Sequence, residues 1–277
     1  MFIFDLIKSI VLGIVEGITE WLPVSSTGHL ILVEEFLNMS LSEDFKEMFN
    51  VVIQLGAILA VIILFWQKIW PFQSKDKGSI IKKDSFMLWF KVIIACVPAV
   101  ILVLLGLDEK CEELFYKPIP VALALIIVGI IFIVVENLRK NRVEKETSLQ
   151  DITFLQAALI GVFQLAAAIF PGTSRSGSTI IGGLSLGLSR VAAAEFTFIL
   201  SIPVMAGASL LKLLDFGFDF TLNEFLVLAA GFLTAFVVSL IAIRFLMNFV
   251  KKHDFKIFAY YRIVLGIAVL AYFYVIK

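Results

Sequence analysis

The most informative segment of the chain reads Glu16-Gly-Ile-Thr-Glu20-Trp-Leu-Pro23-Val-Ser25-Ser26-Thr27-Gly28-His29. Residues 6–22 have a helical pattern, and Pro23 ends this helix because proline lacks an amide hydrogen and disfavours helical geometry at the residue before it. The hydroxyl side chains that follow are typical helix caps and predict a new helix that continues to Phe36. The stretch therefore predicts a helix, a break and a second helix.

Two carboxylates lie just before this break. Glu16 and Glu20 are four residues apart, so both lie on one face of the first helix, roughly 5–6 Å apart at Cβ. Like charges at this spacing repel each other, and anions near the C-terminus of a helix oppose its dipole. The pair therefore predicts that something positive binds there.

The composition indicates a membrane protein. Hydrophobic residues make up 60% of the 277 residues and the mean hydropathy is +1.00, which excludes an ordinary soluble domain. The net charge is zero, so no basic surface indicates a nucleic-acid partner. Asp5 and Lys8 interrupt the N-terminal apolar region, so we predict no cleaved signal peptide. Six apolar segments are long enough to cross a bilayer, which takes about 20 residues: 48–66, 88–106, 120–138, 194–213, 224–247 and 258–276.

A second break resembles the first. It reads Pro171-Gly172-Thr173-Ser174-Arg175-Ser176-Gly177-Ser178-Thr179 and lies within a second helical stretch, 154–188. An offset of 148 residues places Pro23 on Pro171, and then Ser25 on Thr173 and Ser26 on Ser174. The same offset places Gln164 and Ala168 on the two glutamates, so only the first copy carries the acids.

These observations predict an all-α integral membrane protein with one domain, residues 1–277. Repeat one covers about 1–138, a polar linker covers 139–151, and repeat two covers about 152–277. Each repeat contains a re-entrant helical hairpin and three transmembrane helices. An odd number of spans in each repeat requires the second repeat to be inverted, and such proteins carry their special residues where the repeats meet.

The charges of the loops predict the orientation. Three segments are rich in lysine and arginine, with five lysines in 67–87, four basic residues in 139–151 and three lysines in 248–257. Three others are acidic or poor in basic residues: 34–47, 107–119 and 214–223. The positive-inside rule places the first group in the cytoplasm and the second outside. Both termini and the entry of the first hairpin are then extracytoplasmic.

The chemistry of the breaks predicts a phosphate site. A charge at the centre of a membrane helix costs about 2.5–3.5 kcal/mol, so Glu16, Glu20 and Arg175 are candidate functional residues. Two helix N-termini form anion sites, and the planar Arg175 side chain suits phosphate oxygens. A divalent cation, Mg²⁺ or Ca²⁺, between Glu16, Glu20 and phosphate completes the charge balance. The candidate phosphate-binding hydroxyls are Ser25, Thr27, Thr173, Ser174, Ser176 and Thr179.

Ser26 and His29 share one face of the second helix because they are three residues apart. This spacing favours Ser26 as a nucleophile that His29 activates as a base. A phosphohistidine at His29 is the second choice, and attack by metal-bound water is the third.

Other interpretations stay open at this point. The acids and Arg175 also suit a structural ion pair between the hairpins. Inverted repeats with broken helices are common in transporters, here one that flips a lipid carrier, and carboxylates in a membrane also suit an ion channel or exchanger. The confinement of acids to one copy and arginine to the other disfavours pure transport. A homodimer is equally open.

The paired motifs, Glu16-x-x-x-Glu20 with Pro-Val-Ser-Ser-Thr-Gly-His29 and then Pro171 to Thr179, resemble the undecaprenyl-diphosphate phosphatase family linked to bacitracin resistance. The resemblance runs along the whole chain. It implies an enzyme of the bacterial cytoplasmic membrane that removes the terminal phosphate of undecaprenyl diphosphate and regenerates the lipid carrier for cell-wall synthesis. It also implies dependence on a divalent cation and a site open to the extracytoplasmic side. By position, the family's functional residues fall on Glu16, Glu20, Ser26, His29 and Arg175.

Overall fold

The computed structural model describes residues 2–37, 39–73, 80–140, 147–217 and 219–276. Apart from one isolated β-bridge between Phe72 and Ile81, the elements in these ranges are helices. Their bounds are α1 Phe2–Thr19, α2 Ser26–Phe36, α3 Glu43–Leu64, α4 Trp66–Ile69, α5 Lys83–Leu104, α6 Leu107–Phe115, α7 Pro118–Arg139, α8 Phe154–Ile169, α9 Arg175–Ser185, α10 Arg190–Phe216, α11 Leu222–Val250 and α12 Lys256–Ala271, and a π-helical turn, Tyr272–Ile276, follows.

Six helices of the described part are long and apolar enough to cross a membrane, namely α3, α5, α7, α10, α11 and α12. They coincide with the six predicted spans, so the prediction of an all-α protein with membrane helices is confirmed. One predicted loop, 107–119, contains the short helix α6 instead. Residues 141–146 of the predicted polar linker lie outside the described residues.

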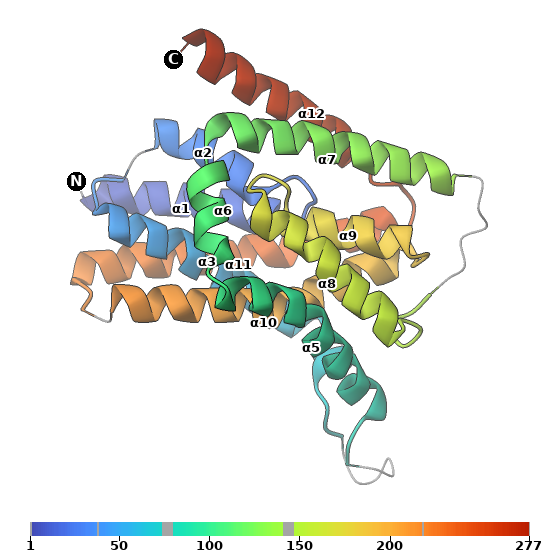
Figure 1. Ribbon diagram of the computed structural model, residues 1–277. Helices are drawn as coiled ribbons and strands as arrows, with labels where there is room; N and C mark the ends of the chain where they lie inside the picture. Colours follow the sequence, from blue (N-terminus) through green and yellow to red (C-terminus); the bar gives the residue numbers. More distant parts are fainter. Residues whose placement is uncertain (1, 38, 74–79, 141–146, 218, 277) are drawn as a thin grey trace.

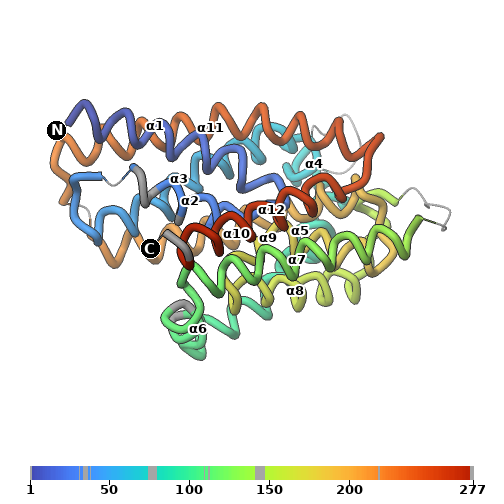
Figure 2. Tube along the Cα trace, turned by 90° about the horizontal axis from the view of Figure 1, so that it is seen from above, coloured from blue at the N-terminus to red at the C-terminus, as the bar shows by residue number. Residues whose placement is uncertain are grey.

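The helices form layers in which distant segments of the chain lie side by side (Figures 1 and 2). Helices α7 and α12 pack along each other, α1 packs along α11, and α3 packs against both α10 and α11. Both chain ends lie at the same end of the molecule as α6 (Figure 1).

Each broken helix packs against the other half of the chain. Helix α1 packs on α11, and α8 packs on α5. Glycine permits the first approach, because a methyl group at Gly13 would lie 2.6 Å from the Gly231 carbonyl oxygen. Gly161, 148 residues after Gly13, approaches the backbone of Ala95 in the same way. Because each broken helix packs on the other half of the chain, both breaks lie toward the centre of the molecule.

Many large apolar side chains are exposed on the outer surface of the molecule. On α1, isoleucines that recur every three or four residues are exposed and form one continuous stripe, Ile3, Ile7, Ile10, Ile14 and Ile18. An exposed apolar stripe along a helix requires an apolar environment. Together with the six membrane-length helices, it indicates a multi-pass membrane protein.

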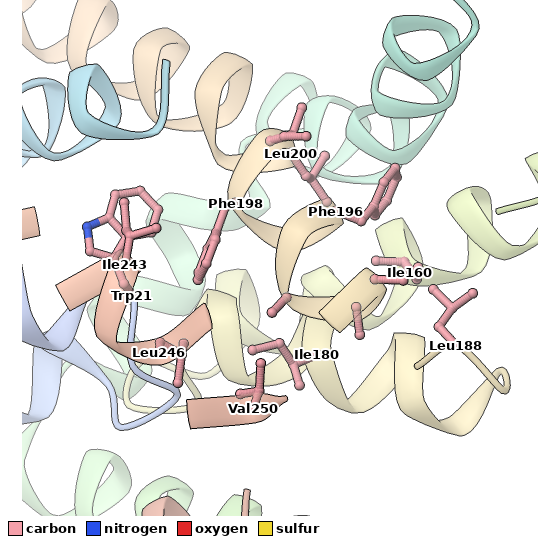
Figure 3. Packing of buried hydrophobic residues seen from close by; sticks show 14 of the residues in the cluster. Trp21, Ile160, Ile180, Leu188, Phe196, Phe198, Leu200, Ile243, Leu246 and Val250 are labelled. Atoms are coloured by element: carbon pink, nitrogen blue, oxygen red, sulfur yellow. The ribbon is translucent and has the colours of Figure 1, made fainter. Parts of the chain in front are cut away.

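The buried apolar core includes residues of the first break and of helices α8 to α11 (Figure 3). Trp21, in the first break, is fully buried and meets Phe198 of α10 edge to face, with ring centroids 5.3 Å apart. Ile180 of α9 and Leu246 of α11 belong to the same apolar cluster. An edge-to-face aromatic pair contributes about 0.5–1.5 kcal/mol beyond its buried area. The packing therefore fixes the first break against α10.

Candidate active site

The two breaks are built alike. Ser25 caps α2 and Ser174 caps α9, and each hydroxyl accepts a hydrogen bond from the amide three residues later, Gly28 N at 3.3 Å and Gly177 N at 3.1 Å. Ser25 has φ 74° and Ser174 has φ 71°, and they are the only non-glycine residues with positive φ in the described part of the chain. Such strain costs on the order of 1–3 kcal/mol per residue and collects at functional sites.

These caps correct the predicted register of the second copy. The offset of 148 pairs Ser25 with Thr173, but the capping geometry pairs Ser25 with Ser174. The prediction is therefore wrong by one residue after the prolines, because the second break contains one extra residue. Gly172, with φ 92°, accommodates the longer turn. Ser26 and Arg175 thus become equivalent, and each is the first residue of its helix.

The side chain of Glu20 joins the two breaks. Its Oε1 atom accepts a hydrogen bond from Arg175 Nη2 at 2.6 Å, and its Oε2 atom accepts one from Ser26 Oγ at 2.9 Å. The carboxylate is 8% exposed, and Arg175 lies 155 residues away in the sequence. The structure therefore brings three predicted site residues into direct contact.

Helix α10 supplies further contacts to Arg175 that the sequence did not indicate. Arg175 Nη1 donates to the Thr197 carbonyl oxygen at 3.1 Å, and Nη2 lies 3.0 Å from Met205 Sδ. The guanidinium carbon also lies 6.0 Å from the centre of the Trp21 ring, within the range of a cation–π interaction. The guanidinium group is thus held on several sides and presents a fixed orientation.

Glu16 is fully buried, and neither carboxylate oxygen has a hydrogen-bond partner among the described residues. Buried carboxylates without hydrogen-bond partners are rare and are typical of positions that bind an ion or water or act in catalysis. No group of three or more His, Cys, Asp or Glu side chains that could hold a metal occurs in the described ranges. Mg²⁺ needs only one or two carboxylates when phosphate and water supply the other ligands. The two oxygens of Glu16 therefore fit a divalent cation, whereas both oxygens of Glu20 already accept hydrogen bonds from Arg175 and Ser26.

The other predicted hydroxyls lie at the breaks, but several bond to protein atoms. Ser176 Oγ donates to the Glu20 carbonyl oxygen at 3.0 Å, which adds a second link between the breaks. Thr179 Oγ1 donates to the Arg175 carbonyl oxygen and accepts from Thr197 Oγ1 at 2.8 Å. Thr27 is half-buried in the first turn of α2, and Thr173 is buried in the second break.

His29 does not bond to Ser26 in this structure. Its Nδ1 atom lies 2.7 Å from the Ser25 carbonyl oxygen, which only accepts, so Nδ1 carries the proton. The Nε2 atom then accepts from the Tyr261 hydroxyl at 2.7 Å. Within the described ranges, Ser26 bonds to Glu20, while His29 bonds to Ser25 and Tyr261, so the role of His29 as a base for Ser26 stays a prediction.

Arg262, also in α12, is a buried cation that the sequence analysis missed. Its side chain is fully buried and donates hydrogen bonds to Pro23 O in the first break and to Gly172 O and Thr173 O in the second. The sequence could have indicated this residue, since Arg262 lies inside the predicted span 258–276, where its charge carries the same cost of membrane insertion as the charge of Arg175.

The fold and these groups define a class of protein. It is a multi-pass membrane protein in which two helix N-termini, an arginine and two glutamates meet at two chain breaks, a combination whose chemistry suits a phosphate-bearing ligand.

Comparison with known proteins is consistent with that class. A family model described as "Bacitracin resistance protein BacA" matches residues 9–268, and the chain belongs to this family. The chain is 58% identical to the undecaprenyl-diphosphatase of Lachnoclostridium phytofermentans over 97% of each chain. It is also 58% identical to an undecaprenyl-diphosphatase of Enterococcus faecalis over 96% of each chain, and 57% identical to that of Desulfitobacterium hafniense over 99% of this chain and 98% of the relative.

Proposed function

We propose that this chain hydrolyses undecaprenyl diphosphate to the monophosphate and inorganic phosphate, and so recycles the lipid carrier for peptidoglycan and other cell-wall polymers. The names of its relatives, which match along nearly the whole chain, support this activity. The single observation that carries the chemistry is the Glu20 carboxylate, which contacts both Arg175 and Ser26. A hydroxyl beside a carboxylate and a guanidinium group is suited to phosphoryl transfer.

Arg175 and the two helix N-termini bind the diphosphate in this proposal. Arg175 is paired with Glu20 in the structure, and a diphosphate offers it several oxygens with a larger negative charge. The planar guanidinium group then forms paired hydrogen bonds to phosphate. The amides at the starts of α2 and α9 add donors, and the hydroxyls of the two breaks are the further candidate phosphate ligands: Ser25, Thr27, Thr173, Ser174, Ser176 and Thr179.

Ser26 is the proposed nucleophile, with Glu20 as its base. Ser26 Oγ attacks the terminal phosphorus and Glu20 Oε2 takes the hydroxyl proton, since the two oxygens lie 2.9 Å apart. The bond between the terminal phosphorus and the bridging oxygen breaks, and the lipid monophosphate leaves with that proton. Water then hydrolyses the phosphoserine and releases inorganic phosphate. His29 instead supports the strained Ser25 carbonyl group.

Glu16 and Glu20 are the residues that would hold a divalent cation. When bound, Mg²⁺ or Ca²⁺ would neutralise the charge of the diphosphate and polarise its phosphorus–oxygen bonds. The two unpaired oxygens of Glu16 support this assignment.

We also infer a single domain of two inverted repeats with re-entrant hairpins in the bacterial cytoplasmic membrane. The alike caps of Ser25 and Ser174, and the exchange in which α1 packs on α11 and α8 on α5, support the repeats. The chain ends and α6 lie at one end of the molecule, while α4 and the turn between α11 and α12 lie at the other (Figure 2). The lysines near α4 and in that turn favour the cytoplasm for their end, so the site opens outward and both termini are extracytoplasmic.

Phosphate release from polyprenyl diphosphate by the purified protein in detergent tests the proposal. We expect the wild type to release phosphate when Mg²⁺ is present, and Arg175→Lys to be about 10²–10³ times slower, because lysine lacks the planar fork. Arg244→Lys, at an exposed residue of α11, is the matched control and should be unaffected. A lipid transporter has no such activity in detergent, so a wild type that releases no phosphate would refute the proposal. Near-normal rates for Arg175→Lys would instead favour the alternative interpretation, in which Arg175 and the glutamates form a structural ion pair between the hairpins.

A further inference from the structure

Arg262 is an unusual residue for a membrane helix. It lies in α12, it is fully buried, and no carboxylate forms an ion pair with it among the described residues. A buried charge without a counter-charge is strongly destabilising unless dense hydrogen bonding compensates it. Its full burial therefore indicates that the charge or the geometry of the guanidinium group performs a task.

The contacts of Arg262 span three separate segments. Nη1 donates to Pro23 O at 3.1 Å, and Nη2 donates to Gly172 O and Thr173 O, both at 2.9 Å. Nε points to Leu125 O of α7 at 3.4 Å. One planar group thus bonds to the first break, the second break and the neighbouring membrane helix.

The bonded carbonyl groups need such a partner. A chain that leaves a helix loses the regular acceptors and donors of that helix, and buried carbonyls without partners are costly. Here the carbonyls of both breaks share one donor whose nitrogen atoms are held at fixed separations by the guanidinium plane. Their separation from each other is therefore set by Arg262.

We propose that Arg262 is a positioning residue, a clamp on carbonyl groups that fixes the first break against the second and so keeps Ser26 and Glu20 opposite Arg175. This inference rests on the proposed phosphatase function. A displacement of about 1 Å at a catalytic group can slow a reaction on the order of 10²-fold, so the clamp matters for turnover without touching the substrate.

The charge of Arg262 has a second effect that the test must separate. A methyl group added at Gly177 would lie 3.3 Å from Arg262 Nη1, so the guanidinium lies beside the first turn of α9. Its charge adds to the partial positive charge of that helix end. Arg262→Lys keeps the charge and loses the fork, while Arg262→Gln loses both.

The experiment compares these two variants with Arg244→Lys and Arg244→Gln, at an exposed arginine of α11 in the same half of the chain. Thermal unfolding in detergent monitors the fold, and phosphate release gives kcat and KM. Spin labels at Ile18→Cys and Phe170→Cys, two exposed residues that flank the breaks, report their separation after Cys96 and Cys111 are replaced by alanine.

We expect both Arg262 variants to fold, to lose about 10²-fold in kcat, and to show a broader distribution of distances between the labels. KM should rise more in Arg262→Gln than in Arg262→Lys because only glutamine removes the charge. The Arg244 variants should match the wild type in all three measurements.

Three outcomes would overturn the clamp: an unchanged distance distribution, a normal kcat in folded Arg262→Lys, or failure of both variants to fold, which would assign Arg262 to folding alone. The spin-label measurement needs no substrate. An inactive wild type would therefore refute the proposed function, while the distances between the labels would still show whether Arg262 fixes the first break against the second.

Discussion

At the scale of single residues, the central observation is that the two carboxylate oxygens of Glu20 accept hydrogen bonds from two different residues. One oxygen accepts from Arg175 and the other from Ser26, so a single carboxylate orients both the proposed nucleophile and the proposed phosphate binder. His29 lies in the same turn as Ser26 but bonds to Ser25 and Tyr261. These partners favour Glu20 over His29 as the base.

The nucleophile can be identified by trapping. Ser26→Ala should be inactive and should form no phosphoenzyme, because the attacking oxygen is missing. His29→Ala should keep measurable turnover, since only the support of Ser25 is lost. Quenched turnover of substrate labelled in the terminal phosphate should yield an acid-stable serine phosphate in the wild type. An acid-labile label on His29, with Ser26→Ala still active, would contradict this mechanism.

Glu16→Gln tests the cation. The change should sharply raise the Mg²⁺ concentration needed for half-maximal phosphate release, because one of two protein ligands is lost. The thermal midpoint should stay equal or increase, since the substitution removes a buried charge without hydrogen bonds. Glu47→Gln, which changes an exposed glutamate paired with Lys212, is the control. Full activity of Glu16→Gln in a chelating buffer would exclude the assigned cation site.

At the scale of elements, the starts of α2 and α9 combine a cap with backbone strain. Ser25 and Ser174 both accept from an amide three residues later while holding positive φ. The same construction in two sequences that differ around it indicates that the geometry of the turn is required at the start of both helices, where backbone amides have no acceptor within the helix.

The hydrogen bond of the cap stabilises the turn and the positive φ destabilises it, and these opposite effects on stability can be separated by substitution. Ser25→Ala removes the cap and keeps the strain, so it should lose about 1–2 kcal/mol of unfolding free energy. Ser25→Gly also removes the cap but adopts positive φ freely, so its thermal midpoint in detergent should exceed that of the alanine variant. Ser174→Ala and Ser174→Gly should repeat the order. Equal midpoints for alanine and glycine would show that the turn is not strained.

At the scale of the complete fold, the site is held together because each broken helix packs on a helix from the other half of the chain. Helix α1 packs on α11 and α8 packs on α5, so neither half of the chain completes a break by itself. Helix α12 then connects to both breaks through Tyr261 and Arg262. The site is therefore a product of the complete chain and depends on elements that lie far apart in the sequence.

The orientation of the molecule can be tested in intact cells. In a background without native cysteines, Glu43→Cys at the start of α3 should react with an impermeant thiol reagent from outside. Lys252→Cys after α11 should react only after the cells are made permeable. Both residues are exposed, so access depends on the side of the membrane, which the lysine distribution predicts. The reverse pattern would invert the topology and place the proposed site toward the cytoplasm.

The features that depend on neighbouring residues could be predicted from the sequence alone. The six membrane helices follow from the length and composition of apolar segments, and the breaks follow from Pro23 and Pro171, which cannot continue a helix. The start of α2 at Ser26 follows from the hydroxyl cap beside it. These features are local, so the local sequence is sufficient to predict them.

The hydrogen-bond partner of each polar group, by contrast, became known from the folded structure and could not be predicted from the sequence. The spacing of Ser26 and His29 allowed them to bond, but Tyr261, 232 residues away, accounts for the other hydrogen bond of the ring. The extra residue at Gly172 shifted the second copy by one position, and Arg262 joined two breaks that lie 148 residues apart. Hydrogen bonds act over about 3 Å in space, so the folded chain, and not the spacing along the sequence, determines which of the compatible partners meet.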